Sequence, residues 1–369
     1  AELEGELGFP LGEYVPGTKA VRESMRFDHA SLEGFLGSCG VPSLSGKVTR
    51  VREFGHGQSN PTYHVTIGGE KEVVLRKKPP GKILRGAHAV EREFQVLRAL
   101  GGAGYPVAPA HVLCEDETVI GTPFYIMEYV PGVVHVNPHM PGCDGATRAA
   151  AYDAMNDTLA RLHTLRPLDI GLGGYGKHQG YYGRQVATWS KQYEAAKTGD
   201  IPDMDSLAAW LAANLPPDAE PAVVHGDFRL DNLIFGGAGN GSVLAVLDWE
   251  LSTIGDPIAD LAYNCLVYYL HPKFQIPGFL GIPLPDGVPS EEEYVAAYCR
   301  RVGRVGGIPN WNFYLAFAFF RIAAILQGVY KRALMGNASS SQAEAIGAQA
   351  ANMAKMGWKL AQVPRNIGA

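Results

Sequence analysis

Three oxygen-bearing side chains, those of Asp227, Asn232 and Asp248, have types and spacing suited to metal-assisted chemistry. Asp227 and Asn232 are five residues apart in the segment His225-Gly-Asp-Phe-Arg-Leu-Asp-Asn232, and Asp248 follows an apolar run. The apolar runs 233–235 and 243–247 flank a Gly-rich turn, so we expect them to pair as an antiparallel hairpin. Asn232 would precede one strand and Asp248 would follow the other, so the three side chains would meet at one end of the hairpin.

A carboxylate beside an amide oxygen offers hard oxygen atoms that suit Mg²⁺, whose other ligands are water and phosphate oxygens. Asp248 and Asn232 are therefore predicted to hold the metal. Asp227, off the metal, would orient an attacking hydroxyl and accept its proton while the metal neutralises charge on a transferred phosphoryl group. The alternative is a surface hairpin with a solvated Asp and Asn, and the spacing favours the chemical interpretation.

The region before these residues is rich in predicted strands. Antiparallel strands are expected at 47–53, 62–67 and 71–76, the first two joined by a Gly-rich loop and the last two by a Gly-Gly turn. A helix is expected from about 87 to 100. Its inward stripe would contain Val90, Phe94, Leu97 and Gly101, with Glu93 flanking the stripe and able to reach the sheet, and Glu91 pointing away.

After short strands near 111–114 and 124–129, the pair Pro131-Gly132 marks a boundary and the pattern becomes helical. Helical spacing is clearest at Tyr152, Met155, Leu159 and Leu162, and shorter helices are expected at 189–196 and 207–214. We therefore predict an α+β fold with two lobes. An extended tail at 1–25 precedes a small antiparallel β lobe with a helix at 26–130 and a larger, mainly α lobe at 131–369.

Composition narrows the function classes. The 369 residues carry 32 Lys and Arg against 37 Asp and Glu, a formal charge of -5, without the basic excess of a protein that binds nucleic acid. Five scattered cysteines without a CxxC pair favour free thiols in a reducing compartment, and no signal sequence is recognised, so we expect a cytoplasmic protein. The apolar stretch 311–330 contains Arg321 near its middle, which favours a buried helix over a membrane span.

Several motifs resemble one family. His225-Gly-Asp-Phe-Arg-Leu-Asp-Asn232, Leu247-Asp-Trp-Glu250 and Gly255-Asp-Pro-Ile-Ala-Asp-Leu261 resemble the aminoglycoside phosphotransferase and choline kinase-like family. Gln58-Ser-Asn-Pro-Thr-Tyr63 and Val74-Leu-Arg-Lys-Lys-Pro-Pro-Gly81 are most similar to the phosphotransferase domain fused to some acyl-CoA dehydrogenases. The resemblance covers about residues 28–335.

This resemblance implies a bilobal protein-kinase-like fold that holds ATP, or another nucleoside triphosphate, and Mg²⁺ between its lobes. It implies Asp227 as the catalytic base and Asn232 with Asp248 as metal ligands, in agreement with the chemistry of the residues. By resemblance alone, fusion or association with enzymes of acyl-CoA metabolism is also expected.

The Gly-rich loop is predicted to contact nucleotide phosphates through its backbone N–H groups. The predicted residues are Gly55, Gly57, Gln58, Ser59 and Asn60. A Gly-rich turn alone is weak evidence, and the downstream motif makes this interpretation the favoured one. The resemblance also places Glu128 and Tyr129 at a hinge whose backbone would meet adenine, although an apolar strand ending at a turn explains the same residues.

Kinase-like folds pair a cation on the third strand with a helix carboxylate. The resemblance assigns Arg76, where the family often has Lys, and Glu93 to this pair. Strand alternation puts Arg76 and Lys78 on one face, so Lys78 stays an alternative. Arginine would still present a fixed charge to phosphate.

Four further residues are expected to support the structure. Asp256 precedes a helix as its cap, with Pro257 at the first position. Asp260 resembles a family position that braces the catalytic loop, and His163 is expected to be a packing residue. Arg321, if inward, needs a buried partner, for which a carboxylate is expected.

The expected function is phosphoryl transfer from ATP to a hydroxyl of a small molecule. A protein kinase is disfavoured because Trp249-Glu250 follows Asp248 in place of Phe-Gly, and no Ala-Pro-Glu signature follows. An aromatic cage would favour a quaternary amine and an acidic pocket an aminoglycoside. The aromatic candidates, which could equally be core residues, are Trp249, Tyr263, Tyr268, Tyr269, Trp311 and Tyr314. The rival function is a nucleotide-binding pseudokinase that acts as a scaffold. Arginine at position 76, where the family often has Lys, favours this function, and the retained Asp227, Asn232 and Asp248 argue against it.

Overall fold

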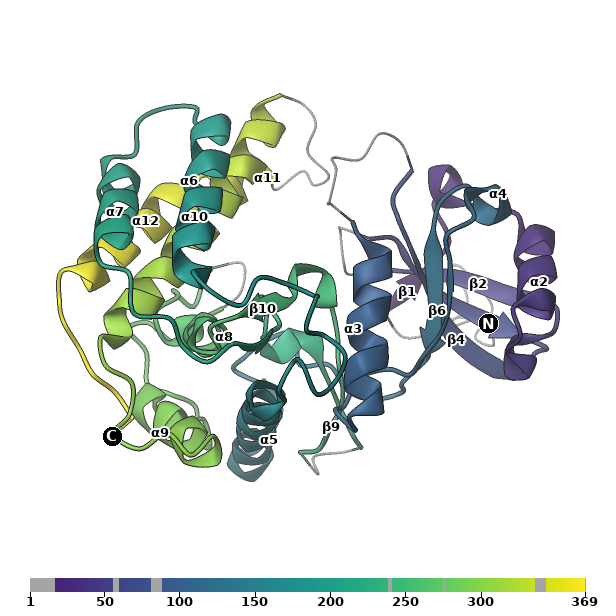
Figure 1. Cartoon of the computed structure of the whole chain (residues 1–369), viewed down its shortest axis with the longest axis horizontal. Coiled ribbons are helices and arrows are strands. Elements are labelled where there is room, and N and C mark those ends of the chain that lie inside the picture. Colours follow the sequence, from purple (N-terminus) through teal and green to yellow (C-terminus); the bar gives the residue numbers. More distant parts are fainter. Residues whose placement is uncertain are drawn as a thin grey trace. The chain divides into compact units, whose positions relative to one another are not determined.

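The computed structural model describes residues 17–55, 60–80, 88–237, 241–274, 277–335 and 343–368. The chain divides into two compact units, one ending at Val130 and the other beginning at Pro131. The mixed α and β content and the antiparallel sheet of the first unit agree with the predicted fold class. Figure 1 shows the elements of both units.

The first unit is built on an antiparallel sheet of six strands in the order β1-β2-β3-β4-β6-β5. The strands are β1 (Thr18–Lys19), β2 (Val48–Phe54), β3 (Thr62–Ile67), β4 (Lys71–Lys77), β5 (Ala110–Cys114) and β6 (Phe124–Glu128). The three predicted strands are confirmed as β2, β3 and β4. The predicted tail contributes an edge strand, because β1 pairs with β2 through Thr18 and Phe54.

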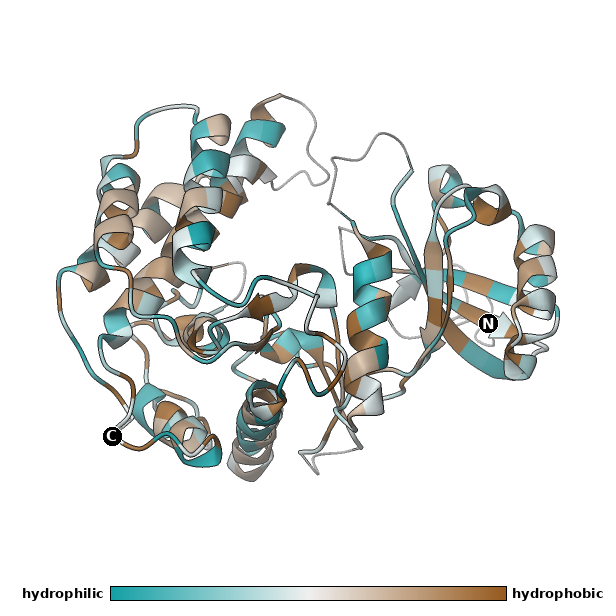
Figure 2. Ribbon diagram, viewed as in Figure 1, coloured by the Kyte–Doolittle hydropathy of each residue, from teal (hydrophilic) through white to brown (hydrophobic). Residues whose placement is uncertain are grey.

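Side chains alternate between the two faces of this sheet, and brown and teal residues are interleaved along its strands in Figure 2. One face, with Tyr63, Val65 and Leu75, packs against Leu32 and Leu36 of α2 (His29–Ser38). Arg76 lies on the other face, where it meets α3 (Val90–Gly102). Helices α2 and α3 therefore cover opposite faces of the sheet (Figure 1).

Helix α3 differs from its prediction in start and in stripe. It begins at Val90 rather than near residue 87, which lies outside the described residues. Its buried residues are Val90, Glu93, Val96, Leu97 and Leu100, whereas Phe94 is only partly buried and Gly101 is exposed. The buried face of α3 differs from the predicted one because Glu93 points inward and contacts Arg76. A hydrophobic pattern does not indicate that an acidic residue is buried.

The second unit is mainly helical. Its helices are α5 (Gly145–Thr164), α6 (Tyr181–Ala196), α7 (Pro202–Ala213), α8 (Ile258–Asn264), α9 (Glu291–Arg301), α10 (Trp311–Leu334), α11 (Ala343–Gly347) and α12 (Ala350–Ala361). The four residues that indicated α5 are all buried, as predicted. Two small antiparallel sheets join the helices: β7 (Ala222–Val224) with β10 (Thr253–Gly255), and β8 (Leu233–Phe235) with β9 (Val243–Val246).

Helix α10 is the central helix of this unit and packs against α6, α7, α8 and α12. By length and composition it could cross a membrane, but 72% of its most apolar window is buried inside the protein. It therefore matches the buried core helix expected from the sequence.

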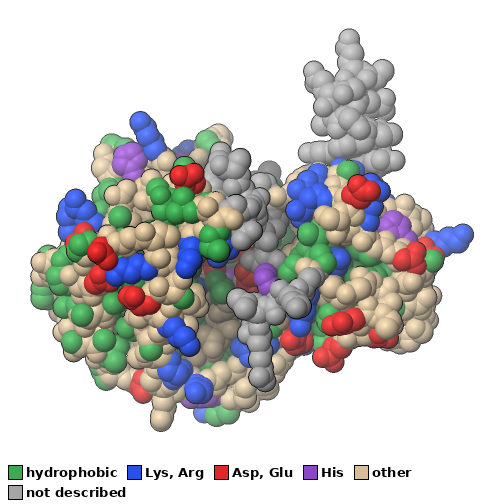
Figure 3. All heavy atoms as spheres, turned by 90° about the horizontal axis from the view of Figure 1, so that it is seen from above, with side chains coloured by type: hydrophobic (Ala, Val, Ile, Leu, Met, Phe, Trp, Pro, Cys, Tyr) green, Lys and Arg blue, Asp and Glu red, His purple; other side chains and the backbone are tan. Residues whose placement is uncertain are grey.

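Surface charges of both signs are interspersed. On the face seen in Figure 3, Lys and Arg side chains alternate with Asp and Glu over the described residues. This distribution agrees with the near balance of charges in the sequence.

Candidate active site

The loop that carries Asp227 leaves strand β7 and is held by its own backbone and by His225. The His225 Nδ1 accepts a hydrogen bond from the Asp227 N–H at 3.1 Å, and its Nε2 donates to the Leu247 carbonyl at 2.8 Å. These two bonds define a neutral imidazole with its proton on Nε2. His225 therefore ties the loop of Asp227 to the end of β9, directly before Asp248.

Gly226 permits the tight turn before Asp227. Its φ is +87°, and a Cβ atom at this position would lie 2.7 Å from the Leu251 carbonyl oxygen. Any other residue would be strained by both its backbone angle and this contact. The glycine is thus required by the local geometry.

Asp260, in the first turn of α8, braces the same loop, as expected. Its carboxylate accepts the backbone N–H groups of His225 at 2.6 Å and Gly226 at 2.8 Å. Burial alone would raise the pKa of Asp260, but the hydrogen bond and charge of His163 and the Gly226 N–H together lower the pKa below its ordinary value. Asp260 is therefore ionised and holds the loop.

His163 and Asp256 are structural, as the sequence indicated. His163 lies 3.4 Å from Asp260 and 2.7 Å from the Tyr298 hydroxyl, so it packs behind the brace. Asp256 accepts the Ile258 N–H at 2.8 Å at the start of α8. Burial raises the pKa of the Asp256 carboxyl.

The predicted hairpin is confirmed. Leu233 pairs with Val246, and the Leu247 N–H donates to the Asn232 carbonyl at 2.8 Å. Asn232 and Asp248 consequently lie at the same end of the hairpin. Asp248 adopts a left-handed backbone conformation with φ +63°, which is uncommon for a residue other than glycine and concentrated at functional sites.

Asn232 also contacts Asp227 directly. Its side-chain nitrogen donates to the Asp227 backbone oxygen at 2.9 Å and to the carboxylate at 3.2 Å. Its amide oxygen is then the atom left for a cation. Asp248 and Asn232 thus present one carboxylate and one amide oxygen, a donor set that fits Mg²⁺ with water and phosphate as further ligands.

Arg229, which the sequence analysis did not single out, is the direct partner of Asp227. Its Nε lies 2.9 Å from one carboxylate oxygen and its Nη2 donates to the other at 3.3 Å, a two-point contact. Its Nη1 lies 3.4 Å from Asp231. The only sequence signal is its position two residues after Asp227.

The electrostatics of this cluster favour a bound cation. The charges of Asp227 and Asp248 both act on Asp231, and Arg229 is a cation that contacts Asp227 and Asp231. Burial, and after it the charges of Asp227 and Asp248, raise the pKa of Asp231 against the opposing effect of Arg229. Divalent metal binding would relieve this excess of negative charge.

Tyr263 of α8 is also in contact with Asp227. Burial, and after it the charge of Asp227, raises the pKa of the phenol. Tyr263 therefore stays protonated and is a hydrogen-bond donor.

A cavity of about 290 Å³ in the second unit reaches Asp227. Asp227, Arg229, Asp231 and Tyr263 form its polar end. The remaining wall is largely apolar and comes from α5, the segment after α8, and α10, with Met155, Leu266, Val267, Leu270, Ile322 and Ile325 among its residues. A hydroxyl beside Asp227 would therefore belong to a molecule whose body lies against apolar side chains.

Most of the aromatic candidates belong to the core. Of the six, Tyr263 alone is among the residues that line the described cavity. Trp249, Trp311 and Tyr314 are buried. Tyr268 and Tyr269 donate hydrogen bonds to the Pro289 carbonyl and to Glu291. The core interpretation therefore holds for three of the candidates, Tyr268 and Tyr269 are partly buried, and the described cavity has no cage built from the six.

In the first unit, the predicted Arg76 and Glu93 pair is present. Arg76 Nε lies 2.7 Å from Glu93, whose carboxylate also accepts from Tyr125 at 3.1 Å and from Asn60 at 2.6 Å. Lys78 instead pairs with Glu91 at 2.9 Å. The geometry therefore resolves the alternative in favour of Arg76 as the partner of Glu93.

The Gly-rich loop is described only at its two ends. Gly57, Gln58 and Ser59 lie outside the described residues. The Gly55 N–H donates to the Gly17 carbonyl at 2.9 Å, and the Asn60 side chain binds Glu93. The Gly55 N–H and the Asn60 side chain are therefore engaged in hydrogen bonds within the first unit.

The Glu128 side chain is engaged inside the sheet. Its carboxylate lies 2.7 Å from Lys71 Nζ and 2.8 Å from His111 Nε2, and its N–H donates to the Pro109 carbonyl. Burial would raise the pKa of Glu128, but the hydrogen bonds from Lys71 and His111 lower it. Tyr129 packs edge-on against His64, with ring centres 4.8 Å apart.

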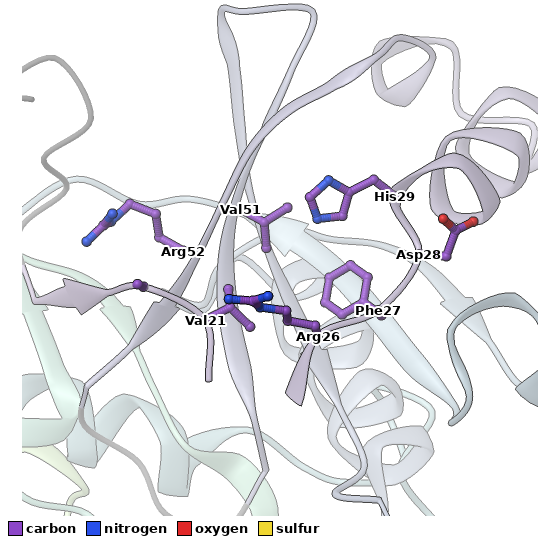
Figure 4. Close-up of a pocket in the computed structure, with 8 residues that line it drawn as sticks. Val21, Arg26, Phe27, Asp28, His29, Val51 and Arg52 are labelled. Carbon is purple, nitrogen blue, oxygen red and sulfur yellow. The ribbon is translucent and has the colours of Figure 1, made fainter. Parts of the chain in front are cut away.

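A larger hollow of about 560 Å³ lies in the first unit, away from all the residues predicted to do chemistry. Figure 4 shows Phe27 and His29 beside Val51, with Arg26 reaching across to Val21. The Asp28 carboxylate at this hollow already caps α2 by accepting the Ser31 N–H at 2.7 Å. Chemistry points to the smaller cavity, because only that cavity contains Asp227.

Arg321 does not have the carboxylate partner that was expected. Its guanidinium lies over the rings of Trp189, at 5.5 Å, and Tyr263, at 5.2 Å. Among the described residues Arg321 forms no ion pair with a carboxylate, and two aromatic rings occupy its surroundings instead. That expectation was wrong.

Comparison with known proteins agrees with this geometry. The sequence profile of the phosphotransferase enzyme family matches residues 50–307. The chain is 50% identical over 363 residues to acyl-CoA dehydrogenase family member 10 of Mus musculus, covering 98% of this chain and 34% of that protein. It is 45% identical to family member 11 of Gallus gallus, covering 94% of this chain and 45% of that protein. The chain thus spans less than half of these relatives.

Solved structures share the fold. A Ralstonia eutropha protein assigned as an aminoglycoside phosphotransferase is 44% identical, with a TM-score of 0.82, and the match covers 92% of this chain and 100% of that one. Aminoglycoside phosphotransferase APH(4)-Ia, in a ternary complex with AMP-PNP and hygromycin B, is 17% identical with a TM-score of 0.57, over 89% of this chain and 98% of that one. The chain therefore belongs to the phosphotransferase enzyme family.

Proposed function

We propose that this protein transfers the γ-phosphoryl group of ATP, or of another nucleoside triphosphate, to a hydroxyl of a small molecule in a Mg²⁺-dependent reaction. The observation that carries the proposal is the Asp227 carboxylate, held by Arg229 and Asn232 beside Tyr263 in a largely apolar cavity. It combines a base, a candidate cation site and space for an acceptor within one unit.

Asp227 would accept a hydrogen bond from the acceptor hydroxyl and take its proton as the bond to phosphorus forms. Arg229 and Asn232 hold this carboxylate, so its oxygens are oriented before the acceptor enters. Asn232 and Asp248 would hold Mg²⁺, which supplies charge neutralisation at the phosphoryl oxygens. Arg76 of the first unit, held in place by Glu93, would bind the nucleotide phosphates.

The lining of the cavity supports an acceptor with an apolar body. Polycationic aminoglycosides need a wall of carboxylates, whereas this wall is formed mostly by aliphatic side chains. The names of the relatives point to acyl-CoA metabolism, so hydroxylated acyl compounds belong in the acceptor panel. Association with an acyl-CoA dehydrogenase is part of the proposal and is checked by co-purification.

The test is a two-part measurement on wild type and Asp227→Asn. We expect Mg²⁺-dependent nucleotide binding in both proteins by thermal shift, and transfer of label from γ-labelled ATP to a hydroxyl acceptor in wild type alone. General-base removal is expected to lower kcat by about 10²- to 10⁴-fold. Binding without transfer to any acceptor would favour the scaffold function, and no nucleotide binding at all would refute both functions.

A further inference from the structure

Arg321 is a largely buried cation whose Nε has no hydrogen-bond acceptor among the described residues. The residue is 8% exposed. Trp189 and Tyr263 contact the guanidinium through their ring faces. Aromatic faces attract the charge, but they do not accept the N–H groups that lie in the plane of the guanidinium. A buried arginine in this state lacks an acceptor of opposite charge.

The carboxylates nearest to this region are engaged elsewhere. The charges of Asp256, Asp260 and Arg321 all shift the pKa of Tyr181. These three residues therefore lie in one region, around Tyr181. Asp256 accepts the Ile258 N–H, and Asp260 accepts two N–H groups of the Asp227 loop. Neither acid is within ion-pair distance of Arg321 among the contacts of the described residues.

Arg321 does not itself line the proposed acceptor cavity, but it lies directly behind a lining residue, Tyr263. Tyr263 lies against the guanidinium with its ring and against Asp227 with its hydroxyl, and it lines the cavity. Ile322, the next residue of α10, lines the cavity as well. One tyrosine therefore separates the unpaired cation from the carboxylate that would activate the acceptor.

We propose that Arg321 binds an oxyanion, a carboxylate or a phosphate, carried by the molecule whose hydroxyl meets Asp227. The acceptor class is then an alcohol with an apolar body and an anionic group. This inference rests on the proposed function for the identity of the ligand as an acceptor. The two aromatic rings hold the planar guanidinium so that its two-pronged edge is set for an oxyanion before binding.

The test compares three ligands of equal chain length: octanoate, octyl phosphate and octan-1-ol. Binding to the full chain is measured by calorimetry at constant ionic strength without nucleotide. We expect one or both anions to bind about ten- to a hundred-fold more tightly than the neutral alcohol, the range of a charged hydrogen bond. The two anions distinguish a carboxylate from a phosphate as the preferred group. Equal binding of all three by wild type would overturn the proposal without any variant.

Arg321→Gln should remove the preference for the anions and leave the affinity for octan-1-ol within a few-fold of wild type. Arg332→Gln is the matched control, because Arg332 is an exposed residue of the same helix, and it should keep the preference. A preference that survives Arg321→Gln would refute the site. If that variant fails to fold, Arg321→Lys keeps the charge but not the planar fork, and undiminished preference in it would count against two-point binding.

The measurement separates this inference from the proposed function. It needs neither nucleotide nor turnover. Loss of phosphoryl transfer with an intact anion preference would refute the proposed function alone, and transfer without any anion preference would refute the Arg321 site alone.

Discussion

Asp260→Asn tests whether one buried carboxylate holds the loop that carries Asp227. Asp260 is 1% exposed and accepts two backbone N–H groups, from His225 and Gly226. Asparagine has one side-chain oxygen, so one N–H would keep a neutral acceptor and the other would face an NH₂ group. Weakening the first bond costs about 1 kcal/mol, and leaving the second N–H unpaired costs about 1–3 kcal/mol. We expect the free energy of unfolding to fall by about 2–4 kcal/mol.

The assay is urea unfolding followed by tryptophan fluorescence. All five tryptophans of the chain lie beyond residue 131, so the signal reports the second unit, which contains Asp260. The matched control is Asp256→Asn in the same segment. Asp256 accepts a single N–H, which asparagine can still receive, and burial raises its pKa, so removing its charge should change the free energy of unfolding by less than about 1 kcal/mol.

The pH dependence adds an independent check with a defined sign. The pKa of folded Asp260 is lowered, so its stabilisation is present above the pKa of about 3.9 for an unfolded Asp and is lost as pH falls through the folded value. In Asp260→Asn, the free energy of unfolding should therefore fall less steeply as the pH is lowered. The pKa of Asp256 is raised, so its contribution has the opposite sign. If Asp260→Asn unfolds within 1 kcal/mol of wild type, or if the control costs as much, the brace is not what stabilises this loop.

Three further changes follow from the same contacts. Gly226→Ala would place a Cβ 2.7 Å from the Leu251 oxygen at a φ of +87°. We therefore expect the free energy of unfolding, measured in urea, to fall by about 1–3 kcal/mol and turnover to be lost. Gly174→Ala, whose Cβ would have no atom within 4 Å, should be nearly neutral. Arg76→Gln should abolish most of the thermal shift given by Mg²⁺-ATP, and a full shift in this variant would contradict the phosphate-binding role, because the variant removes the cation paired with Glu93. Native thiol labelling followed by mass spectrometry should modify Cys39 and Cys143 before the buried Cys114, Cys265 and Cys299, and early labelling of Cys265 would show that its surroundings open.

Local patterns carried a large part of the fold. Two apolar runs around a Gly-rich turn predicted the hairpin, and its geometry placed Asn232 and Asp248 at one end because pairing of neighbouring strands is a short-range interaction. Helical spacing predicted that Glu93 would reach the sheet, and the family resemblance, rather than strand alternation, assigned Arg76 as its partner. The inward stripe of α3 was partly wrong, because an acid with a buried partner looks like a surface residue in a hydrophobic pattern.

The first feature of the sequence was the trio of Asp227, Asn232 and Asp248, and the sequence by itself determined their types, order and shared end of one hairpin. Only the tertiary structure decided what surrounds them. The cavity joins segments near residues 135–155, 263–274 and 322–326, and Arg321 meets rings from α6 and α8. Such contacts join residues far apart in the chain, and no local periodicity records them. That is why the sequence indicated the chemistry at Asp227, while the fold supplied Arg229, the apolar wall and the cation that point to an acceptor.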